Sequence, residues 1–140
     1  MAQTRTSVPL SLACEITPSR VIAARGSSSH RGVDSASART LAPGTIVPGL
    51  TGENVAKPEE LRSAVEDALA AVGGHSKDVI VVLPDSVVRV VLLEFDTLPE
   101  KEEEADGVVR FRLKKSLPFD VEKAVLSYDV RRTTAGVKVV

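Results

Sequence analysis

The stretch 57–83 reads KPEELRSAVEDALAAVGGHSKDVIVVL and combines the clearest helix signal of the chain with a strand signal. Its first part predicts a helix over Lys57–Val72, because apolar residues recur at steps of three and four. Pro58 suits the first helical position, where its missing N–H is not needed, and a Gly-Gly pair ends the pattern. The second part, Val79–Leu83, is a short apolar run rich in β-branched residues, which predicts a buried strand.

Upstream of this stretch, the sequence predicts a hairpin and a loop. Leu10–Ile16 and Arg20–Arg25 have strand-like composition and flank the turn signal Thr17-Pro18-Ser19. Small polar residues dominate 26–38, so a flexible loop is expected there. Arg39–Val47 is a candidate third strand, although a Pro-Gly pair interrupts it.

Downstream, the chain alternates again between strands and a helix. A strand is expected at Val87–Phe95, followed by a helix at Glu100–Ser116 with an acidic first turn and a basic last turn, as the helix dipole favours. Ala124–Arg132 and Val137–Val140 are expected to form a strand pair. The element order predicts a mixed α/β (α+β) fold.

Composition excludes several classes of protein. The chain has 140 residues, with 18 Lys and Arg against 19 Asp and Glu, so it lacks the cationic excess of a nucleic-acid binder. It has no Trp, which argues against a base-stacking platform. No apolar run is long enough to span a bilayer, so no direct membrane insertion is expected, and no signal peptide is recognisable. The expected compartment is the cytosol.

The sequence predicts no catalytic and no metal site. Cys14 is the single cysteine and lies in an apolar strand, which indicates a packed thiol. His30 and His75 lie in loops without an evident partner. The acidic cluster Glu100–Asp106 lacks the ligand spacing of a calcium loop, and the basic residues at 110–115 are interpreted as a cationic helix end.

Proline corners in the second half of the chain carry a family resemblance. They are Val82-Leu83-Pro84-Asp85, Thr97-Leu98-Pro99 and Leu117-Pro118-Phe119, accompanied by Tyr128-Asp129-Val130. In this combination the chain resembles the PilM family of type IV pilus assembly proteins, which have an actin-like ATPase fold related to FtsA. The segment Leu41–Gly49 is similar to the one by which the family enters its inserted subdomain.

This resemblance implies a domain organisation. The first strands of an actin-like (ribonuclease H-like) subdomain would occupy 10–50, and an inserted strand-helix-strand subdomain would occupy 51–130. A truncated return strand would follow at 131–140, and 1–9 would be a disordered N-terminus. The chain would then be a fragment of a longer parent.

The family's nucleotide site is altered here. Its Gly-rich first turn corresponds to Glu15-Ile16-Thr17-Pro18-Ser19, where Thr17 replaces a Gly and Pro18 removes a backbone donor. No cofactor is therefore expected in this chain, and ATP with Mg²⁺ only in a longer parent. Thr17 and Ser19 are the candidates for donating hydroxyls to a phosphate there.

The resemblance also implies a function. Such a protein would be a non-catalytic assembly module at the cytoplasmic face of the inner membrane, and it would bind the cytoplasmic tail of a PilN-family membrane protein. The tail would lie as an extended peptide in a groove between subdomains, and either Val87–Phe95 or Ala124–Arg132 would offer an exposed edge. Self-association by strand exchange is a further expectation.

Three alternatives stay open at this point. The parent could be a nucleotide-binding actin-like ATPase whose site is completed by residues beyond this chain. The chain could instead be the related cytoplasmic domain of type II secretion, the GspL family. The third alternative is a small α/β domain without any link to pili.

Overall fold

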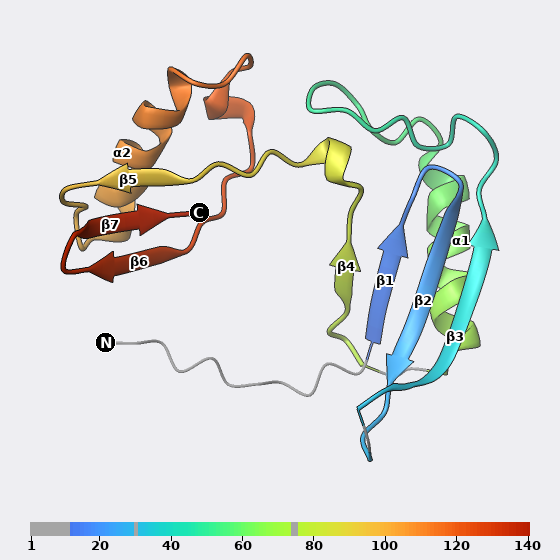
Figure 1. Cartoon of the computed structure of the whole chain (residues 1–140). Helices are drawn as coiled ribbons and strands as arrows, with labels where there is room; N and C mark the ends of the chain where they lie inside the picture. Colours follow the sequence, from blue (N-terminus) through green and yellow to red (C-terminus); the bar gives the residue numbers. More distant parts are fainter. Residues whose placement is uncertain (1–11, 30, 74–75) are drawn as a thin grey trace. The chain divides into compact units, whose positions relative to one another are not determined.

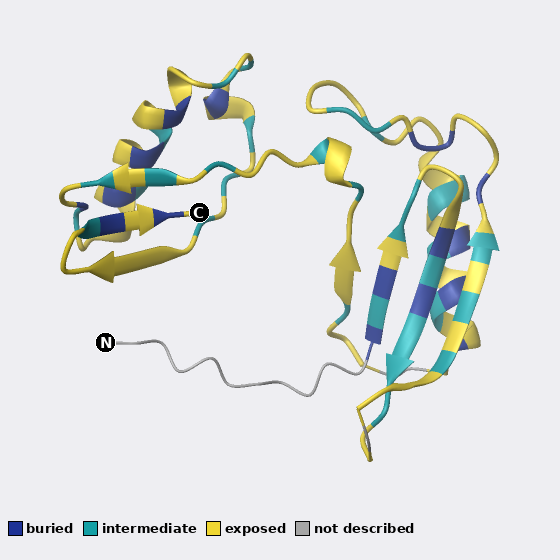
Figure 2. Cartoon of the chain, in the orientation of Figure 1, coloured by how far each residue is buried: buried dark blue, intermediate teal, exposed yellow. Residues whose placement is uncertain are grey.

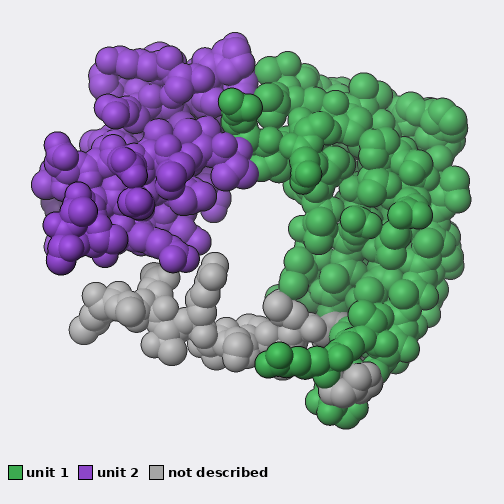
Figure 3. Space-filling view, in the orientation of Figure 1, with its two compact units in different colours: residues 1–89 green, residues 90–140 purple. Residues whose placement is uncertain are grey.

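The computed structural model describes residues 12–29, 31–73 and 76–140. The expected disordered tail at 1–9 and both histidines lie outside these residues. Two compact units make up the chain: the first ends at Arg89 and the second begins at Val90 (Figure 3).

The first unit is built on a four-stranded sheet in the order β3-β2-β1-β4 (Figure 1). Strands β1 (Leu12–Ile16), β2 (Arg20–Gly26) and β3 (Val33–Thr40) pair antiparallel, which confirms the predicted hairpin. Helix α1 (Pro58–Ala71) then carries the chain back to β4 (Ile80–Val82), which pairs parallel to β1.

Helix α1 covers one face of this sheet. Strand alternation places Cys14, Val21 and Ala23 on that face, where they are buried together with Ala64 and Ala68 of the helix. The remaining buried apolar residues of this core are Leu12, Leu41, Ile46 and Val72.

The ends of α1 follow from its sequence. Pro58 occupies the first turn, and Glu59 and Glu60 lie where the dipole favours negative charge. Glu60 Oε1 also accepts a 2.7 Å hydrogen bond from the Ala42 backbone N–H, and this bond is the main cause that lowers the pKa of Glu60. Gly73 has φ +66° just beyond the helix, a conformation that ends helices readily.

The expected flexible loop at 26–38 is wrong for residues 33–38. Strand β3 begins at Val33, and its residues up to Thr40 pair with β2. Ser35, Ser37 and Arg39 are half-buried while their neighbours are exposed, so the strand alternates without an apolar face. Backbone pairing to β2 is enough to order an edge strand whose side chains are small and polar.

The expected burial of Val79–Leu83 is also wrong. Ile80, Val81, Val82 and Leu83 are all exposed, because β4 is an edge strand that α1 does not cover (Figure 2). A single 3-10 turn at Asp85–Val87 follows the strand.

The second unit is a three-stranded antiparallel sheet in the order β5-β7-β6. It comprises β5 (Leu93–Phe95), α2 (Glu102–Lys114), a 3-10 turn (Val121–Lys123), β6 (Val130–Thr133) and β7 (Gly136–Val139). Helix α2 packs on one face of this sheet. The buried residues of this core are Leu98, Ala105, Val109, Leu113, Val121, Val137 and Val139.

Several predicted boundaries change in the structure. The strand expected at Val87–Phe95 is paired over 93–95, and that expected at Ala124–Arg132 is paired from 130. The two units also differ from the expected divisions at 50/51 and 130/131. The reason is that β4 completes the first sheet and α1 packs in the core of that unit, whereas β6 and β7 complete the second sheet.

Candidate functional site

Thr17 and Ser19, the candidate phosphate ligands, lie in the turn between β1 and β2. The Thr17 hydroxyl donates to the Arg20 carbonyl at 2.9 Å and accepts from the Arg20 N–H at 3.1 Å. The Ser19 carbonyl accepts a 2.8 Å bond from the Leu41 N–H. The Thr17 hydroxyl therefore closes the hairpin turn in this structure, while the role of both hydroxyls toward a phosphate stays a prediction.

The thiol of Cys14 lies in the core of the first unit. It is 2% exposed, and burial raises its pKa. A protonated thiol is a poor nucleophile. The structure thus agrees with the packed thiol that the sequence predicts.

We expect Cys14 in the folded chain to react with Ellman's reagent at least about 100-fold more slowly than in urea, because only rare opening exposes the thiolate. Burial raises the pKa of Cys14 in the folded state. Its contribution to the free energy of unfolding is therefore fully present below the pKa of an unfolded thiol, about 8.5. It is lost as pH rises through the folded value. Equal labelling rates in buffer and in urea would contradict the burial.

The charged ends of α2 are used within the unit. Arg110 Nε donates to Asp106 Oδ2 at 2.7 Å, and Arg110 Nη1 donates to the Val121 carbonyl at 2.9 Å. Lys101 pairs with Glu104 at 3.2 Å. In residues 12–29, 31–73 and 76–140, no group of three or more His, Cys, Asp or Glu side chains is placed to hold a metal ion.

Both segments that the sequence offered as exposed edges contribute edge strands. β5 and β6 flank β7 in the three-stranded sheet, so each has one hydrogen-bonding side without a neighbouring strand among the described residues. A free strand edge presents unpaired N–H and C=O groups, to which an extended peptide can add. The second unit therefore has two candidate docking edges.

The register of the sheet shows which residues present their backbone at these edges. Asp129 and Val140 exchange both backbone bonds, at 2.8 and 3.1 Å. Hydrogen-bonded and non-hydrogen-bonded pairs alternate in an antiparallel ladder, so Val137 and Val139 direct their backbone groups toward β5. Their partners on β5, Leu93 and Phe95, therefore form their backbone hydrogen bonds with β7. Glu94 lies between them and directs its N–H and C=O to the free edge.

The segment 90–96 continues the strand pattern beyond the three paired residues of β5. Val91, Leu93 and Phe95 pack against the core under α2. Val90 is 72% exposed and Leu92 58%, and Glu94 and Asp96 are exposed as well. Val90, Leu92 and Glu94 thus form a row of exposed side chains, which we call the β5 row.

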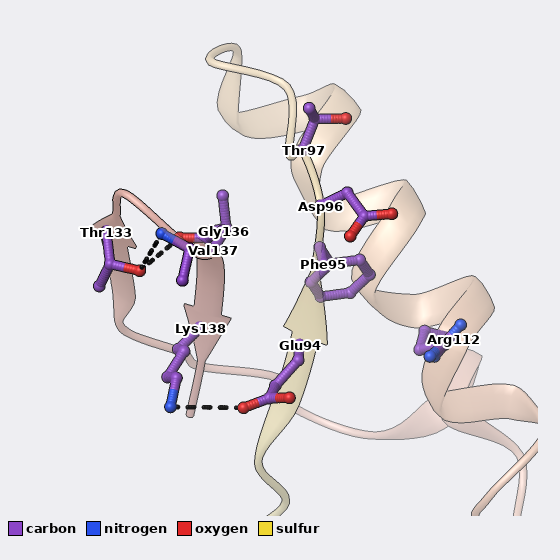
Figure 4. Close-up of a pocket in the computed structure, with 10 residues that line it drawn as sticks. Glu94, Phe95, Asp96, Thr97, Arg112, Thr133, Gly136, Val137 and Lys138 are labelled. Atoms are coloured by element: carbon purple, nitrogen blue, oxygen red, sulfur yellow. Dashed lines mark hydrogen bonds and ion pairs between the residues drawn. The ribbon is translucent and has the colours of Figure 1, made fainter.

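An open cavity of about 600 Å³ adjoins the acidic end of this row (Figure 4). Glu94 pairs across the sheet with Lys138 at 3.3 Å, and the Arg112 guanidinium lies 6.0 Å from the centre of the Phe95 ring. The residues that line the cavity are Glu94, Phe95, Asp96, Thr97, Arg112, Thr133, Ala135, Gly136, Val137 and Lys138. The cavity has charged groups of both signs, and its lining comes from β5, α2 and the β6–β7 hairpin.

Gly136 fixes the position of the β6–β7 hairpin against β5. Its φ of +131° is accessible to glycine alone among the common residues, and a Cβ there would lie 2.8 Å from the Phe95 carbonyl oxygen. The Thr133 hydroxyl donates to the Gly136 carbonyl at 3.0 Å. The turn therefore forms one wall of the cavity with a rigid backbone.

The β6 edge has a different character. Val130 and Arg132 direct their backbone groups outward, by the same alternation. Arg132 Nη1 donates to the Leu98 carbonyl at 3.1 Å, so its side chain is held by the segment before α2. The cavity that adjoins Glu94 is also lined by Thr133, the last residue of this strand.

The sequence predicted the two edge segments but missed the β5 row. Residues 90–93 are all apolar, so no polar–apolar alternation is visible in them. The pairing of Leu93 with Val139 is what shows which side chains face the core.

Comparisons with known proteins support the fold. No family model and no curated protein matches the chain. A chain of the solved "PilM-PilN type IV pilus biogenesis complex" superposes with a TM-score of 0.68 at 21% sequence identity, over 92% of this chain. The match covers 38% of that chain, so the present sequence spans under two fifths of it. The likeness confirms the expected PilM-like mixed α/β fold, a partial actin-like architecture.

Proposed function

We propose that this chain is a non-catalytic assembly module of a type IV pilus platform and binds the cytoplasmic tail of a PilN-like membrane protein. The observation that carries the proposal is the fold match to a chain of the PilM–PilN complex over 92% of this sequence. Neither described helix is long and apolar enough to cross a membrane. By the likeness to PilM, we propose that the module lies at the cytoplasmic face of the inner membrane, as a peripheral protein.

The proposed mode of binding is an extended peptide held by main-chain contacts. The free edges of β5 and β6 support this mode, since each offers unpaired backbone groups at the surface. A tail that is flexible when free loses conformational entropy on binding, and a preformed edge offsets part of that cost with directional hydrogen bonds.

We expect a fluorescent peptide with the sequence of the PilN-like tail to bind the chain saturably in an anisotropy titration. A scrambled peptide of the same composition is the control and should not bind. Equal anisotropy changes with both peptides, or none with the true tail, would contradict the proposed function.

We expect ATP with Mg²⁺ to leave the melting temperature of this chain unchanged. A nucleotide at 100 times its dissociation constant would stabilise the folded state by about 2.7 kcal/mol, which corresponds to roughly 5–10 °C for a chain of this size. The Pro18 turn and the use of the Thr17 hydroxyl within the hairpin support the absence of a shift. A rise of several degrees would favour the ATPase alternative.

Self-association through β4 is a second proposed property. Ile80, Val81 and Val82 are exposed on an edge strand without a charged residue, which is the composition that edges usually avoid. We expect the mean mass from light scattering to rise with concentration, and Val82→Lys to abolish the rise. Ala38→Lys on β3, the other edge of the same sheet, is the matched control and should behave like the unaltered chain.

A further inference from the structure

We infer that the exposed side of helix α2 pairs with the same side of a second copy of this chain, with the two helices antiparallel about a two-fold axis. The inference goes beyond the proposed function, because the contact involves neither the PilN-like tail nor the β4 edge. Three features of this side of α2 carry it: an apolar centre, a glycine beside that centre, and opposite charges at the two ends. The residues of this surface, which we call the α2 face, are Glu104, Gly107, Val108, Phe111, Lys114 and Lys115.

The centre of the α2 face is apolar and lies in water. Ala105, Val109 and Leu113 bury the opposite side of the helix in the core of the second unit. Val108 is 37% exposed and Phe111 65%. Residues three apart on a helix are neighbours, so these two side chains form one apolar patch. A partner that covered the patch would remove this apolar surface from water, which favours association.

Gly107 lies beside this patch, at a position where a helix usually avoids glycine. Glycine weakens a helix interior, and a Cβ at this position would meet nothing within 4 Å. The fold of the unit therefore does not require a glycine here. The missing side chain leaves open space next to Phe111, which lies one turn further along the same side of the helix. A bulky side chain of a second helix can fill such a space, because the two backbones can approach closely at a glycine.

The charges at the ends of the α2 face make it complementary to itself. Glu104 lies four residues before Val108, and Lys115 lies four residues after Phe111. In an antiparallel pair centred between Val108 and Phe111, Glu104 of each copy would therefore lie opposite Lys115 of the other copy. Phe111 of each copy would lie over Gly107 and Val108 of the other copy. A two-fold pair makes each of these contacts twice.

The charged groups of the α2 face are available for such contacts. Among the described residues, neither Lys114 nor Lys115 forms an ion pair, and the Lys115 ammonium lies 5.1 Å from the centre of the Phe111 ring. Glu104 pairs with Lys101 at 3.2 Å, and both side chains are exposed. Exposed ion pairs contribute little to stability, so Glu104 can accept a second cation at low cost.

The pair is expected to be weak. One helix face per chain is a small contact, and interfaces below roughly 1,200 Å² are usually transient. The pair therefore forms where copies are concentrated, for example between chains that already share a β4 contact, since tethering raises the effective concentration. At the lower concentrations that suffice for the light-scattering test of β4, the α2 pair does not raise the mean mass.

Zero-length cross-linking detects a weak pair of this kind. Isotope-labelled and unlabelled chains, all with Val82→Lys to remove the β4 contact, are mixed at high concentration and treated with a carbodiimide, which joins a carboxylate to an amine in contact with it. We expect peptides of mixed isotope content that join Glu104 to Lys114 or Lys115. Mixed peptides that join Glu104 to Lys101 instead would indicate a parallel pair, and either this result or no mixed peptide from α2 would overturn the inference.

Two substitutions test the apolar centre without altering the charges. Phe111→Ser should lower the yield of mixed peptides at least about tenfold, as expected for the aromatic centre of a contact. Gly107→Leu should lower it about fivefold, because the new side chain fills the space that Phe111 of the other copy would occupy. Val125→Ser removes another exposed apolar side chain of the same unit and is the matched control. A yield that Phe111→Ser leaves at the level of this control would overturn the inference.

Charge reversal tests the pairing of the ends with a second readout. Val108→Cys allows a short bis-maleimide to join paired chains without using their charges, and Cys14 is buried and does not compete. Glu104→Lys or Lys115→Glu, each added alone, places like charges opposite each other and should lower the joined fraction about fivefold. A mixture of the two variants restores opposite charges at both ends and should restore joining. A mixture that joins no better than either variant alone would overturn the inference, whereas the titration with the PilN-like peptide tests the proposed function separately.

Discussion

Gly136→Ala is expected to destabilise the second unit by about 3 kcal/mol, through two costs that act together. The φ of +131° is strained for any residue with a Cβ, and the new Cβ would lie 2.8 Å from the Phe95 carbonyl oxygen. That oxygen belongs to β5, and backbone moves less readily than a side chain. Relief of the clash would pull the β6–β7 hairpin away from β5 and open the ladder that orders the β5 row.

The measurement is urea denaturation followed by the fluorescence of Tyr128, the single tyrosine, which packs against the core of the second unit. Gly107→Ala is the matched control, since Gly107 lies within α2 and a Cβ there meets nothing within 4 Å. That control should stabilise the unit by roughly 0.5–1 kcal/mol. Stability changes of the same sign in both variants would refute the argument from backbone conformation.

Ala68→Asp is expected to cost the first unit more than about 4 kcal/mol, which is enough to unfold it. Ala68 is fully buried in the contact between α1 and the sheet, where the neighbouring core residues are apolar. An aspartate there would have to leave water without gaining a hydrogen-bond partner. Protonation would be the least costly response, so the variant should be least unstable in acid.

Ala70→Asp places the same side chain on the exposed side of α1 and serves as the control. It should cost less than about 1 kcal/mol, from an unfavourable charge near the helix C-terminus. Circular dichroism reports the loss of helix, and labelling of Cys14 reports the opening of the first core. An Ala68→Asp chain that keeps Cys14 protected would show that the α1 contact is looser than the structure indicates.

The locally determined parts of the fold could be predicted from the sequence. The helix expected at Lys57–Val72 is observed at Pro58–Ala71, and the helix expected at Glu100–Ser116 is observed at Glu102–Lys114. Their apolar periodicity, terminal charges and Pro and Gly boundaries all act within a few residues. The hairpins around Thr17 and Thr133 depend on equally local turn signals.

The parts set by tertiary pairing could not be predicted. Strand β3 lacks an apolar face and is held by backbone hydrogen bonds to β2. Amino-acid composition alone does not predict such bonds. The predicted burial of Val79–Leu83 is wrong for the opposite reason: the segment has the composition of an interior strand, but β4 lies at an edge of the sheet. The candidate edges were expected from the sequence, whereas the outward direction of Glu94 follows only from the register of β7.

The order of strands in the first sheet has a consequence for synthesis on the ribosome. β1 is made before every other described strand, yet its neighbour β4 is made only after residues 17–79. At about 5–20 residues per second, this interval lasts roughly 3–12 s. During this interval the antiparallel strands β1, β2 and β3 can pair in the order in which they are made. Cys14 stays accessible to cellular oxidants until α1 has been made and packs over it.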